Sequence, residues 1–125
     1  ETQTERAQRW MTAQPVEQMA ISAWVITEFS SALSIKLRVG QLDAQHRADA
    51  LAAFTVLVIE SLTVLPITDA QFRAAARMTD HHALGLRAGD ALHLAVAAEH
   101  GATLCTLDRR LAAAGIGLGV PTRMV

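Results

Sequence analysis

Four acidic residues stand where an apolar strand ends or a helix begins, and their carboxylates are the side chains of this sequence best placed for chemistry. Asp108 directly follows the apolar segment TLCTL, Asp69 follows LTVLPIT, and Glu28 lies just after AISAWV. Asp90 opens an alanine- and leucine-rich helical segment. Carboxylate oxygens are the ligands that Mg²⁺ and Mn²⁺ prefer. Three or four of these acids at one edge of a fold would therefore form a divalent-metal site.

The segments around these acids predict helices that alternate with short strands. Helical spacing or capping signals are found over residues 4–13, 25–37, 43–61, 70–82, 86–101 and 109–115. Short apolar segments that predict strands are found at 19–25, 62–67, 102–107 and 120–125, and Pro121 would confine the last of them to a sheet edge. This alternation is typical of a parallel sheet covered by helices. Because ligands gather where parallel strands end, we expect an α/β fold with the acids at one edge of its sheet.

Length and composition limit the function classes. With 125 residues, 51% of them hydrophobic, the whole chain is expected to form a single domain, residues 1–125. The formal net charge of −1 gives no overall positive field, so any contact with RNA or DNA has to come from a local patch. The single cysteine excludes an internal disulfide, and no apolar run reaches the roughly 20 residues of a membrane-spanning helix. We expect a cytoplasmic protein with no membrane partner.

Each acid also has a purely structural explanation. An acid in the first turn of a helix interacts favourably with the helix dipole, by about 0.3–1 kcal/mol, and this would account for Glu28, Asp69 or Asp90. Asp108 precedes two arginines and would equally serve as a helix cap or as an ion-pair partner. The spacing of the acids along the chain leaves both explanations open.

Three segments of the chain resemble successive motifs of the PIN-domain ribonucleases, especially the VapC toxins of bacterial toxin–antitoxin pairs. These segments are ITEFSSAL, LRAGDALHLAVAAEHGATLCTLD and RRLAAAGIGLGV. The resemblance runs from about residue 19 to the end of the chain, and it is most specific over residues 86–111. It implies a PIN-like α/β/α sandwich, in which helices flank a short, mostly parallel central sheet.

The resemblance also implies a set of site residues. Members of the family hold Mg²⁺ or Mn²⁺ with four acids, of which Glu28 matches the second, Asp90 the third and Asp108 the fourth. Asp90 and Asp108 are expected to bind the ion directly, and Glu28 to bind through water or to orient the attacking water. Thr106 matches a Ser/Thr two residues before the last acid and is expected to hydrogen-bond a metal-binding carboxylate.

The implied reaction is metal-assisted hydrolysis of RNA phosphodiester bonds by an endoribonuclease toxin, with tRNA or ribosomal RNA as the substrate. Arg87 and Arg109 stand close in sequence to Asp90 and Asp108, and we expect them to contact the RNA backbone. A surface ion pair explains Arg109 equally well. The resemblance further implies a cognate VapB-like antitoxin as a partner and a homodimer.

One part of the family pattern has no counterpart here. The family's first acid ends an N-terminal strand at the centre of the sheet, and no such strand precedes Glu1. We therefore expect a domain that lacks this strand and leaves backbone groups of its neighbours unpaired. This departure keeps an alternative open, namely a catalytically inactive PIN-like module that binds a partner protein through its apolar helices.

A phosphoacceptor receiver domain also gathers acids around Mg²⁺, but it requires a lysine at the end of its last strand. The only lysine, Lys36, falls in a helical segment far from the last predicted strand, so this class fits poorly. The central hypothesis is that the carboxylates of Glu28, Asp90 and Asp108 converge in one pocket that holds a divalent ion.

Overall fold

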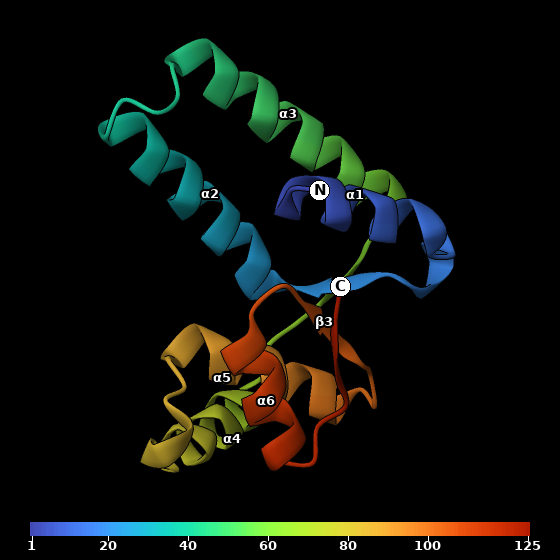
Figure 1. The fold of residues 1–125 in the computed structure, drawn as a ribbon, viewed down its shortest axis with the longest axis vertical. Coiled ribbons are helices and arrows are strands. Elements are labelled where there is room, and N and C mark those ends of the chain that lie inside the picture. The colour runs from blue at the N-terminus through green and yellow to red at the C-terminus, as the bar shows by residue number, and fades with distance from the viewer. The chain divides into compact units, whose positions relative to one another are not determined.

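Helices and short strands alternate along the chain in the computed structural model, which describes residues 1–125 (Figure 1). The α-helices and strands are α1 (Gln3–Ala13), β1 (Ala20–Ser22), α2 (Ala23–Arg38), α3 (Ala44–Ser61), β2 (Thr63–Leu65), α4 (Asp69–Thr79), α5 (Ala88–Glu99), β3 (Leu104–Thr106), α6 (Arg109–Gly117) and β4 (Thr122–Met124). Two short 3-10 helices lie at Val16–Gln18 and His82–Leu84. The predicted order of elements is confirmed.

Several helix starts follow directly from local sequence. The side chain of Asp43 accepts a hydrogen bond from the backbone N–H of His46 and caps α3. Thr68 caps α4, because its hydroxyl accepts from the N–H of Gln71 while the Gln71 side chain accepts from the N–H of Thr68. Such reciprocal bonds satisfy backbone donors that a helix leaves free at its first turn.

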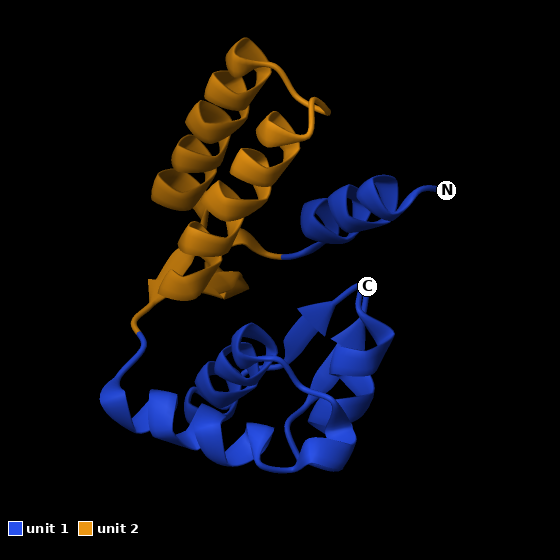
Figure 2. Cartoon of the chain, turned by 90° about the vertical axis from the view of Figure 1, so that its left-hand side faces the viewer, with its two compact units in different colours: residues 1–14, 67–125 blue, residues 15–66 orange.

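The chain divides into two units, which are coloured separately in Figure 2. Unit 1 consists of residues 1–14 and 67–125, and unit 2 of residues 15–66. In unit 1, β3 pairs in parallel with β4, and α5 supplies most of the core. Its cluster of buried side chains contains Leu94, Ala97, Leu111 and Val120.

Close packing in unit 1 depends on one glycine of α6. A Cβ atom at Gly115 would lie 2.2 Å from Cγ2 of Thr122 and 3.0 Å from Cδ2 of Leu94. Only glycine therefore lets α6 approach both β4 and α5 this closely. The hydroxyl of Thr122 also donates a hydrogen bond of 2.7 Å to the carbonyl of Ala112, which ties the last strand to α6.

Unit 2 has a simpler architecture. Strands β1 and β2 pair in parallel, and α2 and α3 form a helical hairpin between them in sequence. The rings of Phe29 and Phe54 stack across this hairpin, with centroids 4.0 Å apart and planes 18° from parallel. Leu33 is the only buried residue of α2, and α3 has none.

The strands confirm the predicted parallel pairing and differ from the expectation in one detail. They form two sheets of two strands each, one in each unit, where a single central sheet was expected. Each strand has three residues and is paired along one edge only. Sheets this small depend on the helices packed against them, because a two-stranded pair is marginal by itself.

No helix combines the length and apolar character that crossing a bilayer requires.

Candidate functional site

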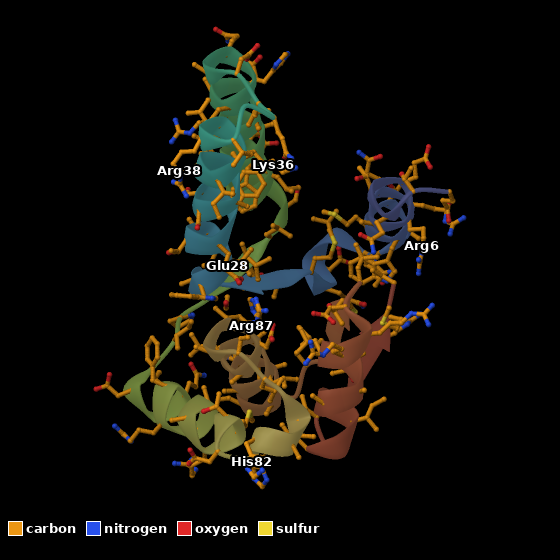
Figure 3. The ribbon with its side chains drawn as sticks, turned by 60° about the vertical axis from the view of Figure 1, so that its left-hand side comes forward. Arg6, Glu28, Lys36, Arg38, His82 and Arg87 are labelled. Carbon is orange, nitrogen blue, oxygen red and sulfur yellow. The ribbon has the colours of Figure 1, made fainter.

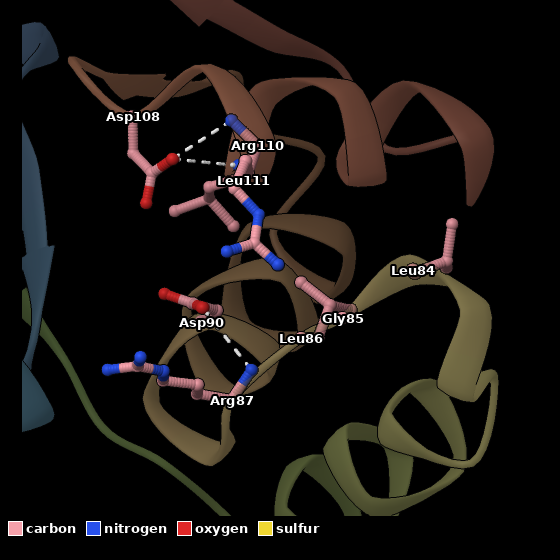
Figure 4. Close-up of a pocket in the computed structure, with 8 residues that line it drawn as sticks. All are labelled: Leu84, Gly85, Leu86, Arg87, Asp90, Asp108, Arg110 and Leu111. Atoms are coloured by element: carbon pink, nitrogen blue, oxygen red, sulfur yellow. Dashed lines mark hydrogen bonds between the residues drawn. The ribbon is translucent and has the colours of Figure 1, made fainter.

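Asp90 and Asp108 come from different elements of unit 1 and line the same pocket (Figure 4). The pocket has a volume of about 260 Å³ and opens between the start of α5 and the start of α6. Its remaining lining consists of Leu84, Gly85, Leu86, Arg87, Arg110 and Leu111. Two of the three carboxylates singled out in the sequence are thus brought to one place.

Asp90 is half-buried in the first turn of α5. Its Oδ2 atom accepts a hydrogen bond of 3.3 Å from the backbone N–H of Arg87, the residue at which the helix begins. This contact turns the carboxylate back toward the helix start, where the helix dipole stabilises a negative charge. The structural explanation for Asp90 therefore holds together with its position in the pocket.

Asp108 is itself the N-cap residue of α6. Its Oδ1 atom accepts hydrogen bonds from the backbone N–H groups of Arg110 at 2.9 Å and Leu111 at 3.2 Å. The hydroxyl of Thr106 accepts a hydrogen bond of 3.0 Å from the backbone N–H of Asp108. Thr106 therefore orients the backbone of Asp108, and its hydrogen bond is to the amide of this residue and not to a carboxylate, as was expected from the sequence.

One oxygen of each pocket carboxylate remains available to a ligand. The hydrogen bonds described above use Oδ2 of Asp90 and Oδ1 of Asp108, so Oδ1 of Asp90 and Oδ2 of Asp108 are not engaged. This donor set fits Mg²⁺, which usually binds through one or two carboxylates and completes its shell with water and substrate phosphate. No group of three or more His, Cys, Asp or Glu side chains comes together closely enough to hold a metal ion by itself.

Two arginines line the pocket beside the acids. Arg87 is the N-cap residue of α5, and Arg110 lies in the first turn of α6. The ion pairs of the structure lie elsewhere, between Arg9 and Glu1 and between His46 and Asp43. The two guanidinium groups in the pocket therefore keep their N–H donors for a ligand, and they balance the formal charges of the two carboxylates.

Arg109, which directly follows Asp108, was the arginine predicted from the sequence, and Arg110 was not. Successive residues of a helix point about 100° apart, so only one of two adjacent arginines faces a given side. Arg109 is exposed and does not line the pocket. Arg110 lies two residues after Asp108, the N-cap of α6. This position favours Arg110 over Arg109 only when the start of the helix is known.

Glu28 lies on α2 in unit 2, and its side chain is exposed (Figure 3). Its convergence with Asp90 and Asp108 stays a prediction. Asp69, the other acid noted in the sequence, is the exposed first residue of α4 and is not among the residues that line the pocket. The helix-dipole explanation therefore suffices for Asp69.

Comparisons with known proteins give one family and two similar folds. Residues 1–117 match the PIN domain family. The structure described as FitAB bound to an IR36 DNA fragment has a TM-score of 0.73 and 18% sequence identity, and the match covers 99% of this chain and 85% of that one. FitAcB from Neisseria gonorrhoeae has a TM-score of 0.68 at 18% identity, with 94% and 83% covered. No curated protein matches the chain.

Proposed function

Because this chain belongs to the PIN-domain family, we propose that it is a metal-dependent endoribonuclease toxin of the VapC type, which hydrolyses phosphodiester bonds in tRNA or ribosomal RNA. The predicted family and its PIN-like fold are confirmed by the family match and by the two similar structures. The reaction, the ion and the substrate are our proposal, and the next paragraphs give the observations that support them.

The observation that carries the proposal is the shared pocket of Asp90 and Asp108. Two carboxylates about 4 Å apart would repel each other by roughly 4 kcal/mol at an effective dielectric of 20. In this pocket the starts of α5 and α6 and two arginines offset the negative charge of Asp90 and Asp108, and each carboxylate keeps one unengaged oxygen for an ion. A site built for capping alone has no reason to bring both acids into one cavity.

In the proposed mechanism, Asp90 and Asp108 would hold Mg²⁺ or Mn²⁺ through their unengaged oxygens. The chemistry that such an ion would supply is polarisation of a phosphate oxygen and activation of water. Arg87 neutralises the phosphate, and Thr106 keeps the backbone of Asp108 in place. Glu28 is assigned by the family resemblance to orient the attacking water or to bind the ion through water.

The partners in this proposal also derive from the family resemblance. We propose a small VapB-like antitoxin that covers the pocket, and a homodimer as the form of the toxin. The antitoxin would compete with RNA for the same residues, so its addition should inhibit cleavage. Arg109, which is exposed outside the pocket, is kept as a predicted RNA contact on the surrounding surface.

A catalytically inactive PIN-like module that binds a partner protein is the second candidate. The observation that favours it is the absence of any group of three metal-binding side chains. The two candidates differ in one measurable property, since an inactive module binds its partner without any ion-dependent cleavage of RNA.

The test is cleavage of total RNA by the full chain with Mg²⁺, with Mn²⁺ and with chelator. Asp90→Asn and Asp108→Asn should each lower the rate by about 100-fold or more, because each removes a charged ligand. Asp69→Asn is the matched control, since this acid also lies in the first turn of a helix but outside the pocket. Equal cleavage by the parent and both pocket variants would exclude the site.

Asparagine is chosen so that the helix caps survive. Its side-chain oxygen still accepts the backbone hydrogen bonds that Asp90 and Asp108 accept. Each variant should therefore lose only the charge–dipole interaction, about 0.3–1 kcal/mol of unfolding free energy. A much larger loss in denaturant titration would mean that lost cleavage reports unfolding.

A further inference from the structure

The geometry points to Arg110 as the residue that grips a backbone phosphate of RNA in this pocket, together with Arg87. This inference rests on the proposed function for the identity of the ligand. In this inference Arg110, and not the adjacent Arg109, is the arginine of α6 that acts inside the pocket. Gly85, which faces Arg110, makes room for its guanidinium group.

The backbone of Arg110 is held at the start of α6. Its N–H donates to Oδ1 of Asp108 at 2.9 Å, so the residue that offers an oxygen to an ion also fixes the arginine that we assign to the phosphate. A phosphodiester bound to an ion at Asp108 would then be within the reach of a long side chain that starts two residues later.

The guanidinium of Arg110 lies against Gly85, the residue before Leu86 in the pocket wall. A Cβ atom at Gly85 would stand 2.7 Å from Nη2 of Arg110, closer than Cβ atoms are found to such neighbours, so the guanidinium at the end of this flexible side chain would have to shift. Gly85 also has a φ of +66°, a backbone conformation that glycine adopts at little cost. The missing side chain thus creates the space that the guanidinium occupies, and Figure 4 shows Arg110 extending toward this residue.

The charge of the pocket explains why arginine is needed here. Asp90 and Asp108 alone would repel a phosphodiester, and the guanidinium groups of Arg87 and Arg110 bring the formal charge of the lining to zero. Arg110 has no ion-pair partner in the protein, so its planar set of N–H donors is available to two phosphate oxygens at once.

Binding of a fluorescent single-stranded RNA to the full chain, measured by anisotropy in chelator over a series of salt concentrations, tests this role without cleavage. Arg110→Gln should weaken binding about tenfold and lower the slope of log affinity against log salt concentration by about 0.7, the value for one phosphate contact on a single strand. Arg73→Gln is the matched control, because it removes the same charge from an exposed position on α4 that does not line the pocket; it should change the affinity less than about twofold, well under a full phosphate contact.

Two further variants separate contact from net charge. Arg110→Lys keeps the charge and loses the planar fork, so it should restore only part of the affinity. Gly85→Ala should weaken binding because its methyl group displaces the guanidinium, and it should add little to Arg110→Gln. Gly40→Ala is its control, since Gly40 has a similar φ of +79° but open space around it.

The outcomes distinguish this inference from the proposed function. If RNA binding depends on Arg110 but no ion-dependent cleavage of RNA occurs, the proposed nuclease activity is contradicted and the role of Arg110 in phosphate binding is supported. Equal losses in Arg73→Gln and Arg110→Gln, or no loss in Arg110→Gln, would overturn the inference. A parent chain that binds no RNA at low salt would overturn it as well.

Discussion

Unit 1 and unit 2 have similar elements but differ in how well they cover their apolar side chains. In unit 1, α5 alone buries six residues, and Leu94 is fully buried. In unit 2, the helical hairpin buries only Leu33. Large apolar side chains of the hairpin that stay exposed are Ile26, Ile35, Leu37, Val39, Val56 and Ile59.

This difference indicates which unit can hold a site in fixed geometry and which unit exposes surface to partners. The pocket with Asp90 and Asp108 belongs entirely to unit 1, whose core holds the starts of α5 and α6 in place. Catalytic groups require this kind of fixed support. Exposed apolar surface of the extent found on the hairpin is typical of surfaces that contact other proteins, and it agrees with the partners proposed above.

The largest expected effect tests the core of unit 1. Leu94→Ala should lower the free energy of unfolding by about 2–5 kcal/mol, because it leaves a cavity in a fully buried site. Ile59→Ala in unit 2 is the comparison, with a side chain that is 77% exposed, and its change should stay within about 0.5 kcal/mol. Chemical denaturation measures both, and equal losses would contradict the contrast between the units.

The next effect tests the close approach of α6 to its neighbours. Gly115→Ala should cost about 1–3 kcal/mol, because the added methyl group collides with Thr122 and crowds Leu94. Gly117→Ala in the same helix is the control, since its nearest contact, Cδ2 of Leu84, would be at an ordinary 3.7 Å. Thermal unfolding of the two variants should therefore separate clearly, and a Gly115→Ala chain as stable as Gly117→Ala would refute the packing described.

A smaller effect tests what holds unit 2 together. In a double-mutant cycle, Phe29→Leu and Phe54→Leu should show a coupling of about 0.5–1.5 kcal/mol, because each variant removes one ring of the stacked pair. Phe72→Leu is the control, since this half-exposed ring stacks on no other. Coupling between Phe72 and Phe29 as large as that of the stacked pair would show that the cycle reports something other than stacking.

The smallest effect concerns the single thiol. Burial raises the pKa of Cys105, and the positive charge of Arg123 offsets part of this increase. The thiolate is the reactive form, so alkylation at neutral pH should be slower in the folded chain than in denaturant. Because the folded state holds the proton more tightly, the associated stability is complete below the unfolded pKa and is lost as pH rises through the folded one.

Arg123→Gln supplies the control for this prediction. Removal of the neighbouring positive charge should raise the thiol pKa further and slow alkylation again. The rate of iodoacetamide labelling against pH measures both effects. Equal rates in the folded and unfolded chain would show that Cys105 is not protected.

Local sequence was sufficient for the elements and for the roles of individual caps. The caps at Asp43 and Thr68 depend on local sequence, because each cap bond joins residues three apart and needs no tertiary contact. The pairing of Asp90 with Asp108 was expected from the resemblance to the PIN family, because the spacing of the acids along the chain left the structural explanations open.

Sequence alone determined the order of helices and strands, because this order depends on neighbours along the chain, and its resemblance to the PIN family selected Asp90 and Asp108 among the acids. Only the tertiary structure decided that Arg110 enters the pocket, that Gly85 makes room for it, and that the strands form two separate sheets. These features depend on contacts between residues far apart in the chain. The spacing of residues along the chain does not indicate which side chain will occupy a pocket formed by distant segments.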